Sequence, residues 1–404
     1  MQLRGKIVIF LAALSLVFIM RMIPLSSRHK FQQITFNSND QFDSNGYAVQ
    51  REFVPPKDVL LDRTIFQENY TSGEIRRLNT IRDFSNGVSI ENAKRPFTSL
   101  SQFQLNFDGK CSEVFKYSSH TPRDLIIYGF QQMTYDSSKL RFDEMLRNMD
   151  VVYSSLRSSM PNVTVVVLTF TPIDSSTRLV FDKYHIKVYN EYTYKDYNGA
   201  NARVLSIGDF LTRHKEDFDR VVFADTRDVF FFNDIFKTFG VNDLILNNEC
   251  KRLNNQNCLK LLQGDTSYKW FKDSYSESLA NEFRMKNVDT INVGLAFGGI
   301  LKMTKYLKTL TKYFDTSKKA LWGYETSLVN YLYYSNRLDE VNITIDGCNQ
   351  RSCFMLEKPA VSLGRNEEGY YLEDGCTPVV VHKGLPDSWL QRKGDTYVYH
   401  WSLR

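Results

Sequence analysis

Two carboxylates lie three positions apart at the end of a short apolar run. The segment Val221 to Phe232 reads VVFADTRDVFFF and places Asp225 and Asp228 after VVFA, a pattern typical of a strand buried on both faces. In an open α/β sheet, ligands bind outside the carboxyl ends of the strands. Acidic groups there are costly to bury without a cation, and a magnesium-type ion that also holds substrate phosphates suits them. The alternative is a cap or Asx turn, with Asp228 paired to Arg227.

A glycine-rich segment, NVGLAFGG at residues 292–299, follows Asp289. Because glycine has no Cβ, Asn292 and Gly294 are candidates for a place where the backbone approaches a bound nucleotide closely. Asp289 is a candidate general base. The alternative for this segment is a turn with tight packing.

The segment VVVHKG at residues 379–384 is a predicted buried strand that ends in three residues able to bind a metal ion or a phosphate. His382 is a candidate metal ligand, because a neutral imidazole binds divalent metals. Lys383 and Gly384 are candidates for contacts with a phosphate. The alternative for a single histidine at a strand end is an ordinary surface residue.

Two charged residues on predicted helices complete the set. Glu325 opens a helix within WGYETSLVNYL, residues 322–332, where it could act on a substrate or only favour the helix N-terminus. Arg203 lies on the helix before the acidic strand and could direct its guanidinium at a diphosphate. The alternative for Arg203 is a solvated helix residue.

Strand and helix patterns alternate from Arg123 onward. This alternation predicts an α/β domain with a Rossmann-like, doubly wound, mostly parallel sheet and right-handed crossovers. The chain has no G-x-G-x-x-G after the first strand and no P-loop motif, which argues against a dinucleotide dehydrogenase or a P-loop enzyme. The expected strands are 124–129, 163–170, 186–189 and one beginning at Val221, and the expected helices are 136–160, 175–184 and 201–214.

The N-terminal part of the chain has the composition of a membrane anchor followed by a linker. Nineteen mostly apolar residues are just enough to span a bilayer, and Arg4 and Lys6 before them favour a cytoplasmic N-terminus. A cleaved signal peptide is the alternative and leads to the same compartment, but no A-x-A-like cleavage pattern follows. We expect a cytoplasmic tail at 1–6, a transmembrane anchor at 7–25, a stem at 26–121 and a catalytic domain at 122–404.

Cysteines and glycosylation sequons agree with a lumenal or extracellular domain. An even number of cysteines in a secretory chain indicates disulfides. The close pairs Cys250/Cys258 and Cys348/Cys353 could form local bridges, which would leave Cys111 with Cys376, but six cysteines allow fifteen connectivities. N-x-T sequons occur at Asn69, Asn162 and Asn342.

Overall composition excludes some functions. The net charge is only +5 and the basic residues are scattered, so we expect no nucleic-acid partner. The hydrophobic content of 42% is sufficient for a large core.

The order of these segments resembles the nucleotide-sugar-dependent glycosyltransferases of the A-type fold. The resemblance covers roughly Arg123 to Leu390: an acidic turn after a buried strand, then INVGLAFGG, then GYETSLVNYL, and last VHKG, as in retaining, glycogenin-like members. The chain departs from the family pattern in three places. The acidic motif is DTRD rather than D-x-D, Glu325 stands where an aspartate is usual, and LPDSW replaces a K-P-W ending.

The resemblance implies transfer of a sugar from a nucleoside diphosphate donor, expected to be UDP-linked, to a glycan or glycoconjugate acceptor. It implies Mn²⁺ or Mg²⁺ held by Asp225, Asp228 and His382, a donor site that includes Asp225, Arg203 and Lys383, and Glu325 or Asp289 as the catalytic carboxylate. The C-terminal histidine favours retention over inversion. With its anchor and stem, the chain is similar to type II Golgi membrane proteins.

Two other functions remain open from the sequence. One is a lumenal protein of the same fold that binds a glycan or a partner without transferring sugar, which the DTRD departure suggests. The other is a metal-dependent phosphoesterase or phosphotransferase, which also needs carboxylates at strand ends. Two-metal hydrolases generally supply more carboxylate and histidine ligands than this chain assembles.

Overall fold

The computed structural model describes residues 105–132, 139–250, 258–354, 364–366, 369–371 and 375–383 of the 404-residue chain. The predicted tail, the predicted anchor at 7–25, most of the predicted stem, Asn69 and Gly384 lie outside the described residues. Within the described ranges, no helix combines the length and the apolar character needed to cross a membrane.

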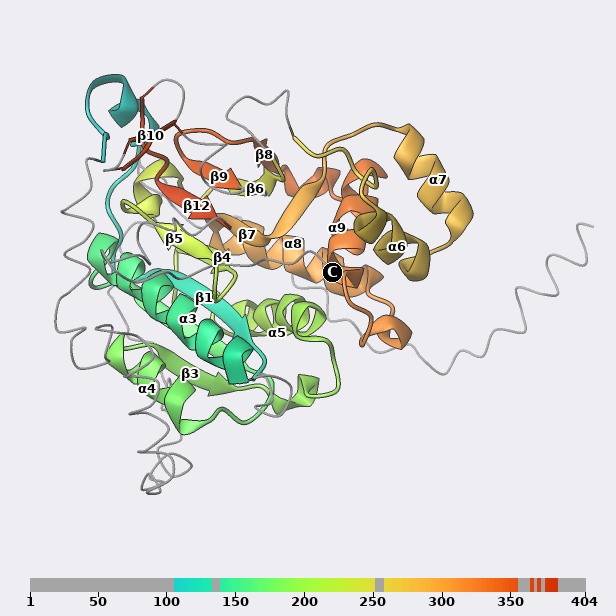
Figure 1. Cartoon of the computed structure of the whole chain (residues 1–404), viewed down its shortest axis with the longest axis horizontal. Coiled ribbons are helices and arrows are strands. Elements are labelled where there is room, and N and C mark those ends of the chain that lie inside the picture. The colour runs from blue at the N-terminus through green and yellow to red at the C-terminus, as the bar shows by residue number, and fades with distance from the viewer. Residues whose placement is uncertain are drawn as a thin grey trace, which may run out of the picture. The chain divides into compact units, whose positions relative to one another are not determined.

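A seven-stranded sheet forms the centre of the domain, with the strand order β3-β2-β1-β4-β7-β6-β8 (Figure 1). Short apolar runs such as VVVL and VVFA form the inner strands, whose residues are buried on both faces. The strands are β1 Asp124–Phe130, β2 Thr164–Thr169, β3 Lys187–Asn190, β4 Arg220–Ala224, β6 Leu244–Asn248, β7 Ile291–Gly299 and β8 Thr344–Asp346.

Four of the six neighbouring strand pairs are parallel, which confirms the predicted mostly parallel α/β sheet. Strand β7 runs antiparallel to both β4 and β6. The reason is topological: the segment between β6 and β7 begins and ends at the same edge of the sheet, so β7 must run back. The glycine-rich segment is therefore a strand, and all nine of its residues are buried.

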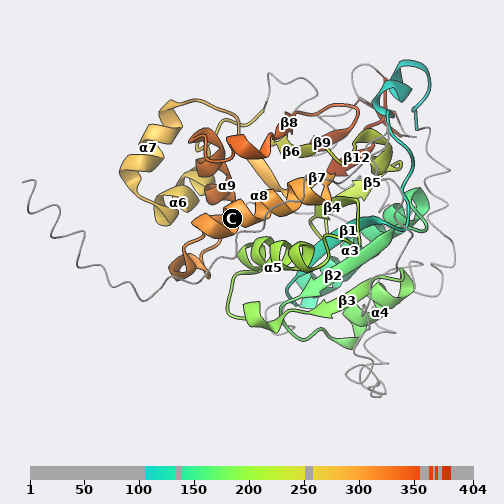
Figure 2. The same ribbon diagram turned by 180° about the vertical axis from the view of Figure 1, so that it is seen from behind.

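Helices cover both faces of the sheet (Figure 2). Side chains alternate along β1, so that Ile126 and Tyr128 join one hydrophobic cluster while Leu125 and Ile127 join the other. Helices α3 Lys139–Ser159 and α4 Ser175–Lys183 contribute to the first cluster, and α5 Gly199–Arg213, α8 Ile300–Tyr313 and α9 Tyr324–Tyr334 to the second. Helices α6 Asp265–Ser274 and α7 Glu277–Met285 form a smaller cluster between β6 and β7 in the chain.

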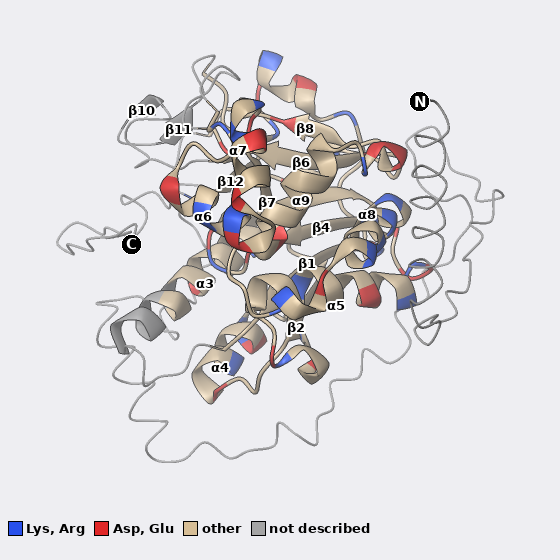
Figure 3. Cartoon of the chain, turned by 90° about the vertical axis from the view of Figure 1, so that its right-hand side faces the viewer, with Lys and Arg blue, Asp and Glu red and all other residues tan. Residues whose placement is uncertain are grey.

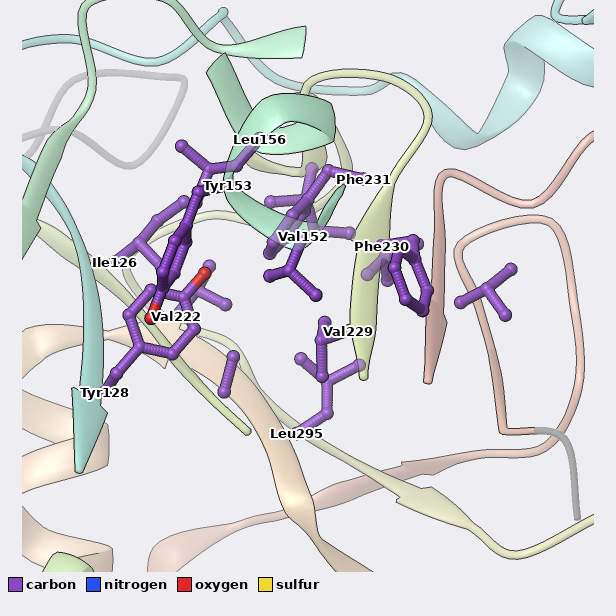
Figure 4. Packing of buried hydrophobic residues seen from close by; sticks show 14 of the residues in the cluster. Ile126, Tyr128, Val152, Tyr153, Leu156, Val222, Val229, Phe230, Phe231 and Leu295 are labelled. Carbon is purple, nitrogen blue, oxygen red and sulfur yellow. The ribbon is translucent and has the colours of Figure 1, made fainter. Parts of the chain in front are cut away.

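A second, three-stranded sheet packs beside α3, in the order β5-β12-β9. Its strands are β5 Val229–Phe231, β9 Ser352–Phe354 and β12 Val380–His382, and a separate hairpin pairs β10 Gly364–Asn366 with β11 Gly369–Tyr371. Figure 4 shows Tyr153 of α3 against Tyr128 of β1, and the two ring centroids lie 5.4 Å apart. Short 3₁₀ helices occur at Gly109–Val114, Tyr192–Tyr194, Ile235–Thr238, Thr316–Lys318 and Asp339–Val341.

Three disulfides join Cys250 to Cys258, Cys348 to Cys353 and Cys111 to Cys376, so the predicted disulfide bonds are present. The third bond connects a segment assigned to the stem with the strand β12 region, 265 positions away. The neighbouring Asn106 adds to this connection, because its backbone N–H donates to the Thr377 hydroxyl at 2.9 Å. Figure 3 shows acidic and basic residues interspersed over the described elements.

Candidate metal centre

Asp225 occupies the position where an open α/β sheet offers a binding site. The chain proceeds outward from β1 to β2 and β3, and α5 then returns it to β4 on the other side of β1. The carboxyl ends of β1 and β4 therefore flank a topological switch point. Asp225 directly follows β4, and its backbone N–H donates to the Gly294 carbonyl of β7 at 2.7 Å.

The small sheet brings the C-terminal histidine to the acidic turn. Strand β5 follows Asp228 and pairs antiparallel with β12, with Val229 opposite His382. The backbone N–H of Lys383 donates to the Asp228 carbonyl at 2.7 Å. As a result, His382 Nε2 lies 3.3 Å from Asp225 Oδ2 and 3.5 Å from Asp228 Oδ1. Figures 1 and 2 both show β4, β5, β7 and β12 meeting in the middle of the domain.

The three side chains fit a metal ion. One ligand atom from each of Asp225, Asp228 and His382 lies within 4.8 Å of the others, and the set combines carboxylate oxygens with an imidazole nitrogen, both of which are common metal ligands. His382 is fully buried; its Nδ1 has no hydrogen-bond partner among the described residues, and its Nε2 faces the Asp225 and Asp228 carboxylates at 3.3 and 3.5 Å. Because buried polar atoms are nearly always satisfied, an ion held between these three side chains would give Nε2 a partner.

The electrostatics favour the forms of these residues that bind metal. Burial lowers the pKa of His382 although Asp228 beside it acts in the opposite direction, so the imidazole is neutral near pH 7. Burial alone would raise the pKa of Asp228, but the neighbouring His382, Lys383 and Arg227 hold it below its ordinary value. Asp228 is therefore ionised.

Gly294 makes room for the cluster. A Cβ at this position would lie 2.8 Å from Asp225 Cγ and closer still to Asp225 Oδ2 and His382 Cε1, whereas real Cβ atoms essentially never approach within 3.0 Å. The space beside Gly294 is thus occupied by the side chains of two predicted metal ligands, and the approach of this backbone to a nucleotide stays a prediction.

Arg203 reaches the cluster from helix α5. Its Nη1 contacts Asp225 Oδ1, and its Nη2 lies 3.7 Å from Glu325 Oε1. The helix can approach the strand end because Gly129 lacks a side chain, and a Cβ there would lie 3.0 Å from Arg203 Cα. Burial lowers the pKa of Arg203, while Glu325 and Asp228 favour its charged form. The guanidinium thus connects the acidic turn to Glu325.

Glu325 lies in the first turn of α9 and is buried. Its backbone N–H donates to Asn201 Oδ1 at 3.1 Å, and the Asn201 amide also donates to the carbonyls of Lys319 and Leu321, both at 2.9 Å. Asn201 and Arg203 lie on the same helix, so α5 holds the start of α9 in place. Glu325 Oε2 and Arg203 Nε have no hydrogen-bond partner within the described part of the chain.

Of the remaining predicted residues, Asn292 is linked to this centre and Asp289 is not. The Asn292 side chain accepts from the Gly294 N–H at 2.7 Å and donates to Glu249 Oε1 at 2.8 Å, so it supports the backbone beside the aspartates. Asp289 pairs with Lys260 at 2.6 Å, and no hydrogen bond or ion pair between described residues joins it to the cluster. Glu325 is thus the predicted catalytic carboxylate that the structure connects to the acidic turn.

Lys383 adjoins the cluster, whereas Gly384 lies outside the described residues. Lys383 has a left-handed backbone, with φ of 61°, and its Nζ lies 5.5 Å from the centroid of the Phe354 ring. Its charge contributes to the lowered pKa of Asp228. Lys383 therefore contributes positive charge beside the acidic turn.

Sequence reasoning missed three residues that shape the site: Gly129, Asn201 and Glu249. Glu249 follows strand β6, favours the charged form of His382 and holds Asn292. A carboxylate at a third strand end is a signal that could have been found, because β6 ends at the same edge as β4. Gly129 and Asn201 match no catalytic or metal-binding pattern. In comparisons with known proteins, no family profile and no curated protein sequence matches this chain.

Proposed function

We propose that this protein is a metal-dependent glycosyltransferase of the A-type fold that uses a nucleoside diphosphate sugar, with UDP as the expected nucleotide. The observation that carries the proposal is the cluster of Asp225, Asp228 and His382 at the switch point, with Arg203 in contact with it. Carboxylates at this place suit a divalent ion that also holds phosphates.

The charges around the cluster support a metal–diphosphate ligand. Asp225 and Glu325 share a single guanidinium, that of Arg203, and Asp228 lies beside the neutral His382, so a divalent ion would add positive charge where the three carboxylates gather. When bound, such an ion stabilises the charge that develops on a leaving diphosphate. Lys383, beside Asp228, adds positive charge for the phosphate oxygens.

Glu325 is the proposed residue for action on the sugar or on the acceptor. Its carboxylate is buried, one of its oxygens faces Arg203, and the other has no partner among the described residues. In an inverting reaction it would accept the proton of the acceptor hydroxyl. We favour retention, because the histidine that follows the glycine-rich and acidic segments is shared with the retaining members that the sequence resembles.

The proposed location is the lumen of the secretory pathway, with a type II anchor in the Golgi membrane. Three disulfides support an oxidising compartment. Two of the three sequons, Asn162 and Asn342, are exposed on the described surface, where a glycan could be attached. Digestion of the protein from a secretory host with an endoglycosidase should increase its gel mobility, and an unchanged mobility would contradict this location.

The decisive experiment uses the full-length protein in detergent with Mn²⁺ and a panel of UDP- and GDP-sugars. Release of nucleoside diphosphate from one donor, abolished by a chelator, is expected. Asp228→Asn should lower kcat/KM by about 100-fold or more, because it removes one anionic ligand at nearly constant size. Asp182→Asn, an exposed aspartate on α4, is the control and should change kcat/KM by less than about twofold.

Two outcomes would contradict the proposal. If nucleotide binds but no sugar is released or transferred from any donor, the protein is a binding member of this fold. If nucleotide binding is unchanged by chelator and by Asp228→Asn, the acidic turn has only a structural role.

A further inference from the structure

An exposed indole precedes the helix that carries Glu325. Trp322 is 57% exposed, and its ring meets that of Trp270 on α6 at 6.4 Å between centroids and 72° between planes. Single exposed apolar side chains are common on protein surfaces, but this indole differs in that a second aromatic ring holds it in place.

The backbone around Trp322 is shaped to keep this pair together. Gly323 has φ of 78°, which favours glycine, and a Cβ there would lie within 3.0 Å of the Trp270 ring. Asn201 fixes the loop from the other side through the carbonyls of Lys319 and Leu321 and through the N–H of Glu325. The indole thus has a defined position relative to the proposed catalytic carboxylate, three residues away.

The surroundings of Trp322 indicate what kind of ligand could bind on its exposed ring. In the described part of the chain the other exposed large hydrophobic residues are Met285 and Tyr313, which lie at the ends of α7 and α8. Polar positions, including Lys269 and Asp273, flank Trp270 on α6. A single aromatic face among polar groups is too small for a membrane or for a large protein interface. It matches a pyranose, which has one face of C–H groups and a rim of hydroxyls.

We infer that Trp322, supported by Trp270, is the acceptor subsite and stacks on a sugar ring of a glycan. The electron-rich face of the indole attracts the polarised C–H bonds of a pyranose. Glu325, three residues further along the chain, contacts Arg203 and through it the acidic turn, so the same segment carries the stacking residue and the proposed catalytic carboxylate. The inference rests on the proposed function, since it assigns the acceptor side of the same reaction.

The test measures saccharide binding directly, without turnover. The full-length protein is titrated with lactose, N,N′-diacetylchitobiose, α-1,3-mannobiose and methyl β-xyloside by calorimetry and saturation-transfer NMR. At least one should bind, and Trp322→Ala should weaken that binding more than about tenfold. Tyr313→Ala, at an aromatic residue that is 38% exposed, should leave it within about twofold. Binding of UDP with Mn²⁺ should be the same in both variants.

The measurements of saccharide binding and of UDP binding test this inference and the proposed function separately. If no saccharide of the panel binds at concentrations up to about 50 mM, or if Trp322→Ala binds it as well as the unaltered protein, the acceptor subsite is refuted. If a saccharide binds at Trp322 while UDP with Mn²⁺ does not bind at all, the donor chemistry fails and the sugar subsite stands.

Discussion

Adding one methyl group at Gly294 should disable the metal centre while leaving every proposed ligand in the chain. In Gly294→Ala the new Cβ would lie 2.8 Å from Asp225 Cγ, whereas ordinary contacts begin at 3.4 Å. The carboxylate must therefore move by at least about 0.6 Å, since its Oδ2 would lie closer still, and this is about three times the ~0.2 Å tolerance of metal–ligand distances. His382 must move as well, because the same Cβ would collide with its ring.

The expected loss follows from these displacements. Disturbing the groups that orient metal ligands costs about 10–100-fold in affinity, and here two of the three ligands are displaced directly. We therefore expect Mn²⁺ to bind at least about 100-fold more weakly, which corresponds to about 2.7 kcal/mol. Extra volume in a packed site also lowers the free energy of unfolding, by about 1–3 kcal/mol. Mn²⁺ titration by calorimetry, with a thermal melt of each sample, separates the two effects.

Gly264→Ala is the matched control, because a Cβ at this exposed position would meet only Ser267 Oγ, at an ordinary 3.6 Å. It should change Mn²⁺ affinity by less than about twofold. If Gly294→Ala is folded and binds Mn²⁺ within about threefold of the unaltered protein, the ion is not held by Asp225 and His382, and the assignment of the centre is wrong.

Three further outcomes are expected. Because burial lowers the pKa of His382 in the folded chain, stability should fall as the pH drops through about 6.5, where the unfolded imidazole begins to bind the proton, and Mn²⁺ affinity should fall only at a lower pH, where the folded imidazole is protonated; a fall of Mn²⁺ affinity in acid that is the same in His382→Ala would remove His382 from the centre. Replacing both Cys111 and Cys376 by serine should lower the free energy of unfolding in urea by about 2–5 kcal/mol, since the bond closes a loop across 265 positions; an unchanged midpoint would show that the bond constrains nothing in the unfolded chain. Arg203→Lys keeps the charge but loses the planar fork that reaches both Asp225 and Glu325, so affinity for UDP in the presence of Mn²⁺ should fall about tenfold; a fall of less than about twofold would limit Arg203 to holding Asp225.

The cluster was predictable because strand ends and chemical types are both visible in a sequence. The apolar run before Asp225 indicates a buried strand, and VVVH indicates a second one that ends at His382. The carboxyl ends of strands are where an α/β sheet places its ligands. The pairing of β12 with β5 was not predictable, because three-residue strands have no periodicity that identifies a partner.

The glycine-rich segment shows a limit of pattern reasoning. Glycine weakens a strand and commonly marks a turn, so NVGLAFGG has the composition of a loop. In the structure it is β7, paired on both sides, with Gly294 beside Asp225 and His382. The missing side chain leaves room for Asp225, which follows β4, and for His382 on β12, and these contacts exist only after the sheets have formed.

Asn201 was beyond sequence reasoning for a related reason. Its side chain binds backbone atoms of Lys319, Leu321 and Glu325, more than a hundred positions away, and backbone atoms have no residue type. An ion requires particular side chains, so its ligands are visible as residue types. The position of Glu325 and Trp322 relative to that ion depends on an amide and on main-chain carbonyls. Any loop sequence with the same main-chain conformation would accept these hydrogen bonds from Asn201 equally well. No sequence motif can therefore reveal the contact.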